Sequence, residues 1–223
     1  MVDRQNILEL AKNLLFPKFC AGCGQEGCWL CDECLPKINT SKTTTLSVGQ
    51  TEKAAANLDG VTALFDYGEN SVSKLIKMFK YNYLLEIADI FEKIIIDSKF
   101  SNAWSDFIII PVPLHARRER ERGFNQAEII SKLFSKKLGL NINNNLHRVI
   151  YTAQQAKLSG EERRKNLKNA FVWGDVSGDP LIAEKKVLLV DDVFTTGATM
   201  LECAEVLKNH GVKIVCGLVL ARG

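Results

Sequence analysis

The sequence predicts an α/β fold, a mainly parallel sheet flanked by helices, preceded by a small cysteine-rich module. From Leu58 onward, apolar runs typical of buried strands alternate with helix-like segments, a pattern that favours parallel strands joined by crossover helices. Five of the seven cysteines fall between Cys20 and Cys34. A polar stretch rich in Thr, Ser and Lys separates these two zones.

The composition suits a globular chain with one full-sized core and a small additional module. The chain has 223 residues, of which 46% are hydrophobic and 25% charged, and this argues against wholesale disorder. The formal net charge of +3 is too small to indicate nucleic-acid binding, so any basic surface must come from local clustering of Lys and Arg. We expect no membrane span, because no run of about 18 apolar residues occurs.

We divide the chain into three parts. Residues 1–40 are predicted to hold an amphipathic helix over Met1–Phe16 and the cysteine module. Residues 41–57 are predicted to form a polar linker, and residues 58–223 the α/β domain. The predicted strands are Val61–Tyr67, Phe107–Val112, Lys186–Val190 and Val212–Leu220; the predicted helices are Ser71–Tyr81, Leu84–Asp97, Phe124–Leu138 and Thr199–His210.

The cysteine spacing predicts a structural metal site in a reducing compartment. An odd number of cysteines without a signal peptide argues against a disulfide framework and for the cytoplasm. Cys20-x-x-Cys23 and Cys31-x-x-Cys34 have the spacing of two zinc knuckles, which together supply four thiolates to one Zn²⁺. Since Cys28-x-x-Cys31 is also a permitted pair, spacing leaves open whether Cys28 replaces a ligand.

The segment most informative about function is Val187–Met200, VLLVDDVFTTGATM. Apolar residues lead to Asp191 and Asp192, which we expect at the carboxyl end of a central strand, where ligands of open α/β sheets bind. A hydroxyl-rich turn then enters a helix and exposes backbone N–H groups at the positive end of the helix dipole. The turn comprises Thr195, Thr196, Gly197, Ala198 and Thr199. Carboxylates for sugar hydroxyls beside donors for a phosphate indicate a sugar-phosphate ligand.

An arginine-rich loop is predicted after the strand Phe107–Val112. Because the carboxyl ends of parallel strands meet at one edge of a sheet, we expect this loop to face the Asp191 turn. A guanidinium group binds pyrophosphate bidentately, which makes Arg118 and Arg122 candidate ligands. His115 is a further candidate, as a hydrogen-bonding group rather than a general base. For Arg117 and Arg120, ion pairing with the neighbouring Glu119 and Glu121 is an equal alternative.

A polar, basic stretch from Gln155 to Phe171 lies between two core strands. Charged excursions of this kind often close over a sugar phosphate as lids. Arg163 is the candidate lid residue. For Lys165 and Lys168, a solvated surface helix is at least as good an interpretation.

These segments together resemble the ComF family of competence-associated, phosphoribosyltransferase-like proteins, which includes ComFC and GntX. The resemblance rests on the N-terminal cysteine pairs, PVPLH with Arg118, RGFNQA from Arg122, the series from Gln155 to Phe171, and VLLVDDVFTTGAT. It covers nearly the whole chain except Ile38–Asn57. RGFNQA beside the VLLVDDVFTTGAT segment is the most specific of these features.

The resemblance implies a type I phosphoribosyltransferase-like sheet and phosphoribosyl pyrophosphate as ligand. Asp191 and Asp192 would contact the ribose hydroxyls, and the turn Thr195–Thr199 would hold the 5′-phosphate. Mg²⁺ would arrive with the pyrophosphate, whose oxygens it prefers. The family pattern also places the second cysteine pair directly before Leu35, which favours Cys34 as a zinc ligand.

The resemblance further implies a role in natural transformation. The protein would handle incoming single-stranded DNA on the cytoplasmic side of the inner membrane, next to a helicase-like translocase of the ComFA type. Candidate DNA-binding residues are basic or are aromatic platforms for stacking: Arg117, Arg118, Arg120, Arg122, Arg163, Arg164, Lys165, Lys168, Phe124, Tyr151 and Trp173. An equal alternative is that the aromatic residues belong to the core and the charged residues are merely solvated. The alternatives are a metabolic phosphoribosyltransferase acting on a base or amine, and an interaction module with a regulatory sugar-phosphate site. Neither turnover nor an acceptor follows from the residues.

Overall fold

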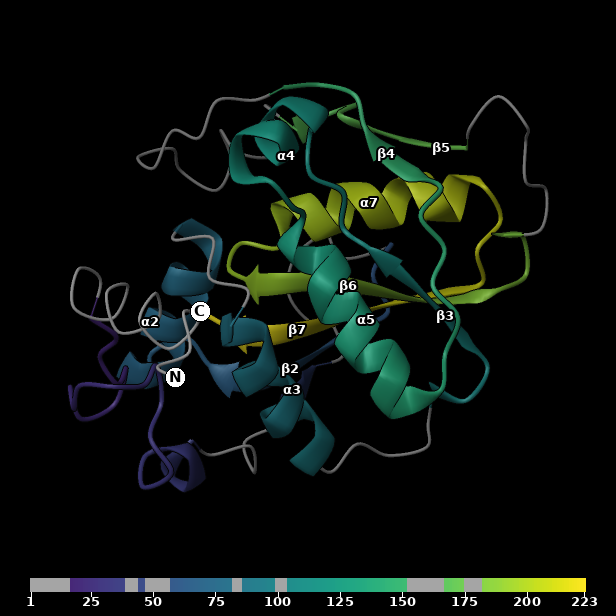
Figure 1. The fold of residues 1–223 in the computed structure, drawn as a ribbon. Coiled ribbons are helices and arrows are strands. Elements are labelled where there is room, and N and C mark those ends of the chain that lie inside the picture. Colours follow the sequence, from purple (N-terminus) through teal and green to yellow (C-terminus); the bar gives the residue numbers. More distant parts are fainter. Residues whose placement is uncertain are drawn as a thin grey trace, which may run out of the picture.

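The chain folds around a mainly parallel sheet (Figure 1). The computed structural model describes residues 17–38, 44–46, 57–81, 86–98, 104–151, 167–174 and 182–223. Within these residues the main sheet has the strand order β1-β2-β7-β6-β3, in which only β1 runs antiparallel to its neighbour. Its strands are β1 (Thr44–Leu46), β2 (Gly60–Asp66), β3 (Phe107–Pro111), β6 (Lys186–Phe194) and β7 (Ile214–Arg222), and a separate hairpin pairs β4 (Leu146–Arg148) with β5 (Phe171–Trp173).

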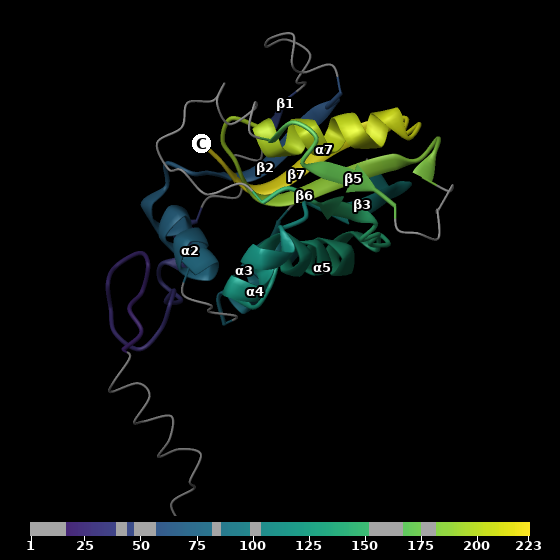
Figure 2. The ribbon, with the colours of Figure 1, turned by 90° about the horizontal axis from the view of Figure 1, so that it is seen from above.

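Helices cover both faces of the sheet (Figure 2). Helix α7 (Ala198–Asn209) lies on one face; α2 (Asn70–Tyr81), α3 (Glu86–Asp97) and α5 (Gln126–Leu138) lie on the other. A short helix, α4 (Ala116–Arg122), follows β3, and a 3₁₀ turn, η1 (Leu35–Lys37), ends the cysteine module. The four parallel strands β2, β7, β6 and β3 point their carboxyl ends toward α2 and the cysteine module (Figure 1).

Two cores fill the spaces between sheet and helices because side chains alternate along each strand. In β6, Leu188 and Val190 join the core beneath α2, α3 and α5. Val187 and Leu189 join the core beneath α7 and the β4–β5 hairpin. All four are fully buried, which explains the continuous apolar run that predicted this strand.

The predicted strands and helices of the α/β region are confirmed, with shifts of a few residues at their ends. Helix α5 begins after Asn125 and ends at Gly139, whose left-handed backbone (φ 70°) provides the predicted stop. Strand β6 runs on to Phe194, beyond the predicted end at Val190. The predicted helix over Met1–Phe16 lies outside the described residues.

Three elements differ from the sequence prediction. The segment after β3 was expected to be a loop, but all four of its arginines lie on helix α4. The β4–β5 hairpin was not predicted. In the predicted linker, Thr44–Leu46 forms β1 and pairs with β2, so these residues belong to the sheet.

Candidate functional site

The carboxylates of Asp191 and Asp192 sit at the carboxyl end of β6, still within the strand. Asp191 pairs in register with Val219 of β7, and the backbone N–H of Asp192 donates to Asp191 Oδ1 at 2.8 Å. By the alternation of the strand, Asp192 continues the Leu188–Val190 side and Asp191 the opposite side. Asp192 is buried, with 5% of its surface exposed, and Asp191 is half-buried.

Asp192 is paired with Lys80, a residue that the sequence motifs did not identify. Lys80 lies in the last turn of α2, and its Nζ is 2.8 Å from Asp192 Oδ2 and 3.0 Å from Oδ1. The two residues are 112 positions apart in the chain. The structure thus places a cation on one of the two predicted diol-binding carboxylates.

Asp191 faces a different set of groups on the α7 side of the sheet. Burial raises its pKa to about 7, the negative charge of Asp192 acts in the same direction, and Lys80 and Arg148 oppose the rise. Arg148 comes from β4, and its guanidinium group lies 5.4 Å from the Phe171 ring centroid. Burial, and then the charge of Arg118, lowers the pKa of Arg148. Arg148 is a second site residue that the sequence analysis missed.

The predicted phosphate-binding turn directly follows these carboxylates. Thr195 and Thr196 are exposed, and Gly197 adopts a left-handed backbone with φ 72° as the N-cap of α7. A Cβ on Gly197 would lie 2.5 Å from the Phe194 ring, so both conformation and space require glycine here. The Ala198 N–H points toward Thr196 Oγ1 at 3.4 Å. Threonine hydroxyls and N–H groups at a helix start form a site suited to an anion.

Helix α4 places its arginines beside the end of the β4–β5 hairpin. His115 is the N-cap, and its Nδ1 accepts a hydrogen bond from the Arg117 N–H at 3.1 Å. The Arg117 side chain pairs with Glu121 at 3.1 Å, as the ion-pairing alternative predicted. The guanidinium carbons of Arg117 and Arg118 lie 4.7 and 5.9 Å from the centroid of the Tyr151 ring. His115 therefore has a local structural role as a helix cap.

The RGFNQA segment connects α4, α5 and α2. Gly123 ends α4 in a left-handed conformation (φ 80°). Asn125 caps α5 by accepting from the Ala127 N–H at 3.1 Å, while its amide donates to the Val112 carbonyl at 3.2 Å. This pair of bonds fixes the start of α5 against the end of β3.

Gln126 is buried at 4% exposure and bridges two site elements. Its Oε1 accepts from Arg122 at 3.2 Å, and its Nε2 donates to the backbone carbonyl of Lys80 at 3.3 Å. The candidate pyrophosphate ligand Arg122 is thereby linked to the helix that carries Lys80. The spacing of the motif does not reveal this role, since the acceptor lies 46 residues earlier.

Of the remaining candidates, Arg163, Arg164 and Lys165 lie outside the described residues, and Lys168 is exposed. For two of the three candidate aromatics, the structure favours the alternative of packing against the core. Phe124 packs on Phe79 in one core, with ring centroids 5.6 Å apart, and Trp173 packs against the other core. Tyr151 is exposed at 38%.

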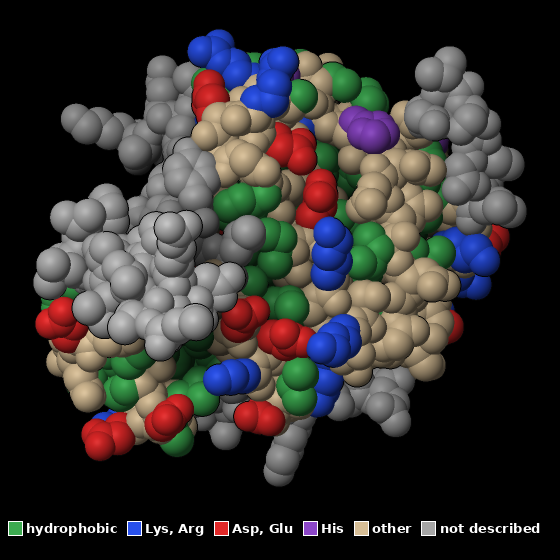
Figure 3. Space-filling model, in the orientation of Figure 1, with side chains coloured by type: hydrophobic (Ala, Val, Ile, Leu, Met, Phe, Trp, Pro, Cys, Tyr) green, Lys and Arg blue, Asp and Glu red, His purple; other side chains and the backbone are tan. Residues whose placement is uncertain are grey.

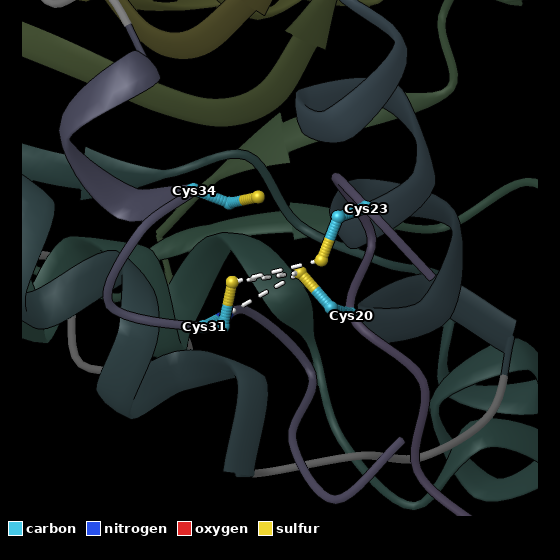
Figure 4. Close-up of side chains that lie close together, drawn as sticks. All are labelled: Cys20, Cys23, Cys31 and Cys34. Carbon is cyan, nitrogen blue, oxygen red and sulfur yellow. Dashed lines mark hydrogen bonds between the residues drawn. The ribbon is translucent and has the colours of Figure 1, made fainter. Parts of the chain in front are cut away.

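The four predicted metal ligands converge on one point (Figure 4). The Sγ atoms of Cys20, Cys23, Cys31 and Cys34 all lie within 4.8 Å of one another. Cys31 Sγ is 3.7 Å from both Cys20 Sγ and Cys23 Sγ. A tetrahedral site with Zn–S bonds of about 2.3 Å requires S–S separations of about 3.8 Å. The four residues therefore fit a metal ion such as zinc.

The surroundings of Cys20 favour a thiolate ligand. Burial acts to raise its pKa, but hydrogen bonds from the backbone at Cys23, Cys31 and Gly22 outweigh this effect and lower the pKa to about 6. The Cys31 N–H, for example, donates to Cys20 Sγ at 3.3 Å. Burial, and then the charges of Cys20, Cys31 and Cys23, raise the pKa of Cys28, but this residue is not a member of the four-sulfur cluster. The geometry thus favours Cys34 over Cys28.

Gly22 permits this convergence by its lack of a side chain. A Cβ at this position would lie 2.7 Å from Cys34 Sγ and 2.9 Å from Cys34 Cβ. The tight turn of the first knuckle depends instead on Gly24, with φ 79°. Sequence analysis alone does not separate these two roles.

The cysteine module packs directly on the α/β region. Ala21 belongs to the core beneath α2, and its carbonyl accepts a bond from Lys74 of α2 at 3.3 Å. Glu86 at the start of α3 accepts from Trp29 at 2.8 Å and pairs with Lys18 at 2.5 Å. The module therefore rests on the same helix that brings Lys80 to the carboxylates.

Comparisons with known proteins agree with this combination of sheet, turn and cysteines. Residues 121–223 match the phosphoribosyl transferase domain family. The chain is 43% identical over 115 residues to competence protein F of Haemophilus influenzae, covering 51% of this chain and 49% of that protein. It is 29% identical over 203 residues to the DNA utilization protein YhgH of Salmonella typhimurium, covering 88% and 85%. These similarities support a ComF-family protein.

The chain is also 29% identical over 149 residues to competence protein ComFC of Bacillus subtilis, covering 65% of this chain and 57% of that protein. The match to the Haemophilus protein spans about half of that protein's length. The relatives named here are thus competence and DNA-utilization proteins. Among the described residues, no helix is long and apolar enough to cross a membrane.

Proposed function

We propose that this ComF-family chain binds phosphoribosyl pyrophosphate at the carboxyl end of β6 and acts in DNA uptake. The observation that supports the proposal most strongly is the succession of two carboxylates and an N–H-rich, threonine-rich turn at one strand end. Asp191 and Asp192 suit sugar hydroxyls as acceptors. The turn Thr195–Thr199, with Gly197 in the left-handed conformation, suits the 5′-phosphate.

The pyrophosphate end of the ligand would meet the cationic groups around these carboxylates. Arg118 and Arg122 on α4 are the predicted ligands, and Arg148 adds a cation whose charge is felt at Asp191. Mg²⁺ would enter with the pyrophosphate and neutralise part of its charge. In the cysteine centre, four sulfur ligands and tetrahedral spacing support structural Zn²⁺.

The DNA-related part of the proposal concerns the surface over α4. Lys and Arg side chains gather there at the top of the face in Figure 3. Tyr151 is exposed beside Arg117 and Arg118, and an aromatic ring flanked by cations suits a base and its phosphate. The relatives named for competence and DNA utilization lend weight to this function. We place the protein at the cytoplasmic side of the inner membrane, with a helicase-like translocase of the ComFA type as partner.

Calorimetry with phosphoribosyl pyrophosphate and Mg²⁺ tests the sugar-phosphate site. We expect the wild type to bind the ligand and the Asp191→Asn/Asp192→Asn double variant to lose at least tenfold in affinity, because each asparagine offers one neutral acceptor oxygen in place of two charged ones. Ribose 5-phosphate and pyrophosphate, titrated separately, show which half of the ligand each group holds. Equal affinity of two folded proteins would refute the assignment. Release of pyrophosphate on addition of a base or amine would favour the metabolic alternative.

Binding of single-stranded DNA at a series of salt concentrations tests the second part. We expect affinity to fall with salt, since each neutralised phosphate releases counterions, with a slope of about 0.7 per contact. Arg117→Gln should reduce the slope by about one contact. Lys213→Gln is the matched control. Lys213 is also exposed, but it directly precedes β7 and so lies at the amino ends of the parallel strands, away from α4. A wild type that binds no strand at low salt would favour the interaction-module alternative.

A further inference from the structure

We propose that Lys80 is a positioning residue of the sugar site: its ammonium group orients Asp192 for a ribose hydroxyl and occupies the place that a divalent cation would take beside this carboxylate. The inference rests on the proposed binding of phosphoribosyl pyrophosphate. Lys80 lies outside the DDVFTTGAT segment, but it would determine how Asp192 in that segment binds the sugar. The carboxylates would then receive a sugar, while the metal ion would remain with the pyrophosphate.

The geometry of the ion pair supports an orienting role. Lys80 Nζ lies within 3.0 Å of both Asp192 oxygens, so rotation of the carboxylate would break one of the two contacts. The Asp192 side chain is 8% exposed and that of Lys80 26%. A carboxylate so deeply buried needs a counter-charge to stay ionised. Each oxygen keeps further lone pairs, so the paired carboxylate can still accept a sugar hydroxyl.

The backbone of Lys80 is itself held in place. Its carbonyl accepts the bond from Gln126, which is buried and also bound by Arg122. Helix α2 is further held at Lys74 by the carbonyl of Ala21 in the cysteine module. The ammonium group is therefore delivered from a helix that is fixed at both of these points, and this favours a fixed role over a chance surface contact.

The local charges explain why a cation is needed at this position. The charged groups that act on Asp191 are Asp192 on its own strand, Lys80 from α2 and Arg148 from β4. On the α7 side, burial and then the charge of Asp191 raise the pKa of the Cys203 thiol. Without Lys80, the repulsion between the adjacent carboxylates of Asp191 and Asp192 would be less well balanced, which would favour binding of a metal ion between them. Hard cations such as Mg²⁺ and Mn²⁺ prefer carboxylate oxygens. Lys80 prevents this by supplying a permanent positive charge.

Mn²⁺ binding to the ligand-free protein tests this inference without phosphoribosyl pyrophosphate. The variants are Lys80→Met, which keeps the side-chain length without the charge, and Lys80→Arg, which keeps the charge. Electron paramagnetic resonance of free Mn²⁺ should show no binding to the wild type or Lys80→Arg, and one ion per chain for Lys80→Met. That binding should disappear in Lys80→Met/Asp192→Asn. Equal Mn²⁺ binding by wild type and Lys80→Met, or none by a folded Lys80→Met, would overturn the inference.

Calorimetry with phosphoribosyl pyrophosphate, at a Mg²⁺ concentration equal to that of the ligand, supplies the second measurement. Lys80→Met should bind about 10- to 100-fold more weakly, the range expected for loss of a charged hydrogen bond, and Lys80→Arg should recover most of the affinity. The acid limb of the pH profile should move to higher pH in Lys80→Met, since Asp191 loses the positive charge of Lys80 that lowers its pKa. Unchanged affinity and profile would contradict the inference. A wild type without affinity for the ligand would instead refute the proposed function, and the Mn²⁺ result would still decide the role of Lys80.

Discussion

The cysteine module and the predicted phosphate-binding turn Thr195–Thr199 hold their candidate ligand-binding groups by different means. In the module, the buried apolar residues within 17–38 are Cys20, Ala21, Cys34 and Ile38, and two of these four are themselves candidate ligands. The turn Thr195–Thr199 instead follows β6, in which Val187–Val190 are fully buried between two helical layers. We therefore expect the module to depend on a bound metal for its stability, whereas the turn is held by the sheet.

This difference determines which changes each region should tolerate. Loss of a ligand should release the metal from the module, because few apolar contacts are left to hold the two knuckles together. The sheet should keep its fold when a side chain of the turn is altered, because its core lies elsewhere. Changes in the turn should then weaken ligand binding with little loss of overall structure.

Cys34→Ser should have the largest effect of all, with complete loss of the metal. A structural zinc site contributes about 10–16 kcal/mol of apparent binding free energy in small zinc modules, and three sulfurs cannot retain this. Cys28→Ser is the matched control and should keep one zinc per chain. Elemental analysis of the purified proteins gives the answer. If Cys28→Ser loses the metal while Cys34→Ser keeps it, the ligand set is wrong.

Gly197→Ala should lower affinity for phosphoribosyl pyrophosphate by about 10- to 100-fold. An alanine at φ 72° costs about 1–2 kcal/mol, and its Cβ would displace the Phe194 ring from beneath the turn. Gly139→Ala is the control, because Gly139 has φ 70° with open space around it and lies at the end of α5. Calorimetry and thermal unfolding of both variants separate the effects. A similar loss of affinity in Gly139→Ala would show that strain alone is responsible.

Asp191→Asn should stabilise the protein, and more so as the pH rises. Burial, followed by the charge of Asp192, raises the folded-state pKa of Asp191 to about 7 from an ordinary value of 3.8. The folded wild type therefore holds a proton that the unfolded chain has lost between these two values, and its stability falls as the pH increases through this window. Asp191→Asn does not lose stability in this way. Its free energy of unfolding should therefore exceed that of the wild type by a difference that grows to the order of 2 kcal/mol above pH 7.

Urea unfolding of wild type and Asp191→Asn at pH 5, 6, 7 and 8 measures this difference. Other titrating groups cancel between the two proteins. A stability difference that does not change with pH would mean that Asp191 is ionised across the whole range. Ionisation of Asp191 would then not lower the stability of the folded protein.

Gly22→Ala should have the smallest effect, a loss of about tenfold in metal retention. Its Cβ would meet Cys34 Sγ at 2.7 Å, so the second knuckle must shift by several tenths of an ångström. Gly24→Ala is the control: its φ of 79° adds backbone strain, but nothing lies within 4 Å of the new Cβ. Competition with a chelator compares the two. If Gly24→Ala loses the metal more readily, turn conformation matters more than space between the knuckles.

Much of the architecture could be predicted from the chain because its signals are local. Continuous apolar runs identified β3 and β6, and the Cys-x-x-Cys pairs identified the four cysteines of the candidate metal site in Figure 4. Gly139 marked the end of α5. Each of these signals lies within a few consecutive residues. Within such a window, the hydrophobic pattern, the cysteine spacing or the glycine is sufficient to predict the local structure.

Short elements could not be predicted in this way. Strands β4 and β5 have three residues each and are too short to show a period. Helix α4 has seven residues, none of them buried, so no apolar stripe indicates it. Strand β6 extends past its apolar run because Asp191 and Val193 still pair with β7.

The partners of the site residues depended on the three-dimensional arrangement. Lys80 and Asp192 are 112 residues apart, and Gln126 reaches Lys80 across 46. No spacing rule relates residues so distant, because their contact follows from how α2 and α5 pack on the same face of the sheet. The chemistry of the carboxylates and the turn can thus be inferred from the chain, whereas the cations that balance those carboxylates become visible only when the helices are in place.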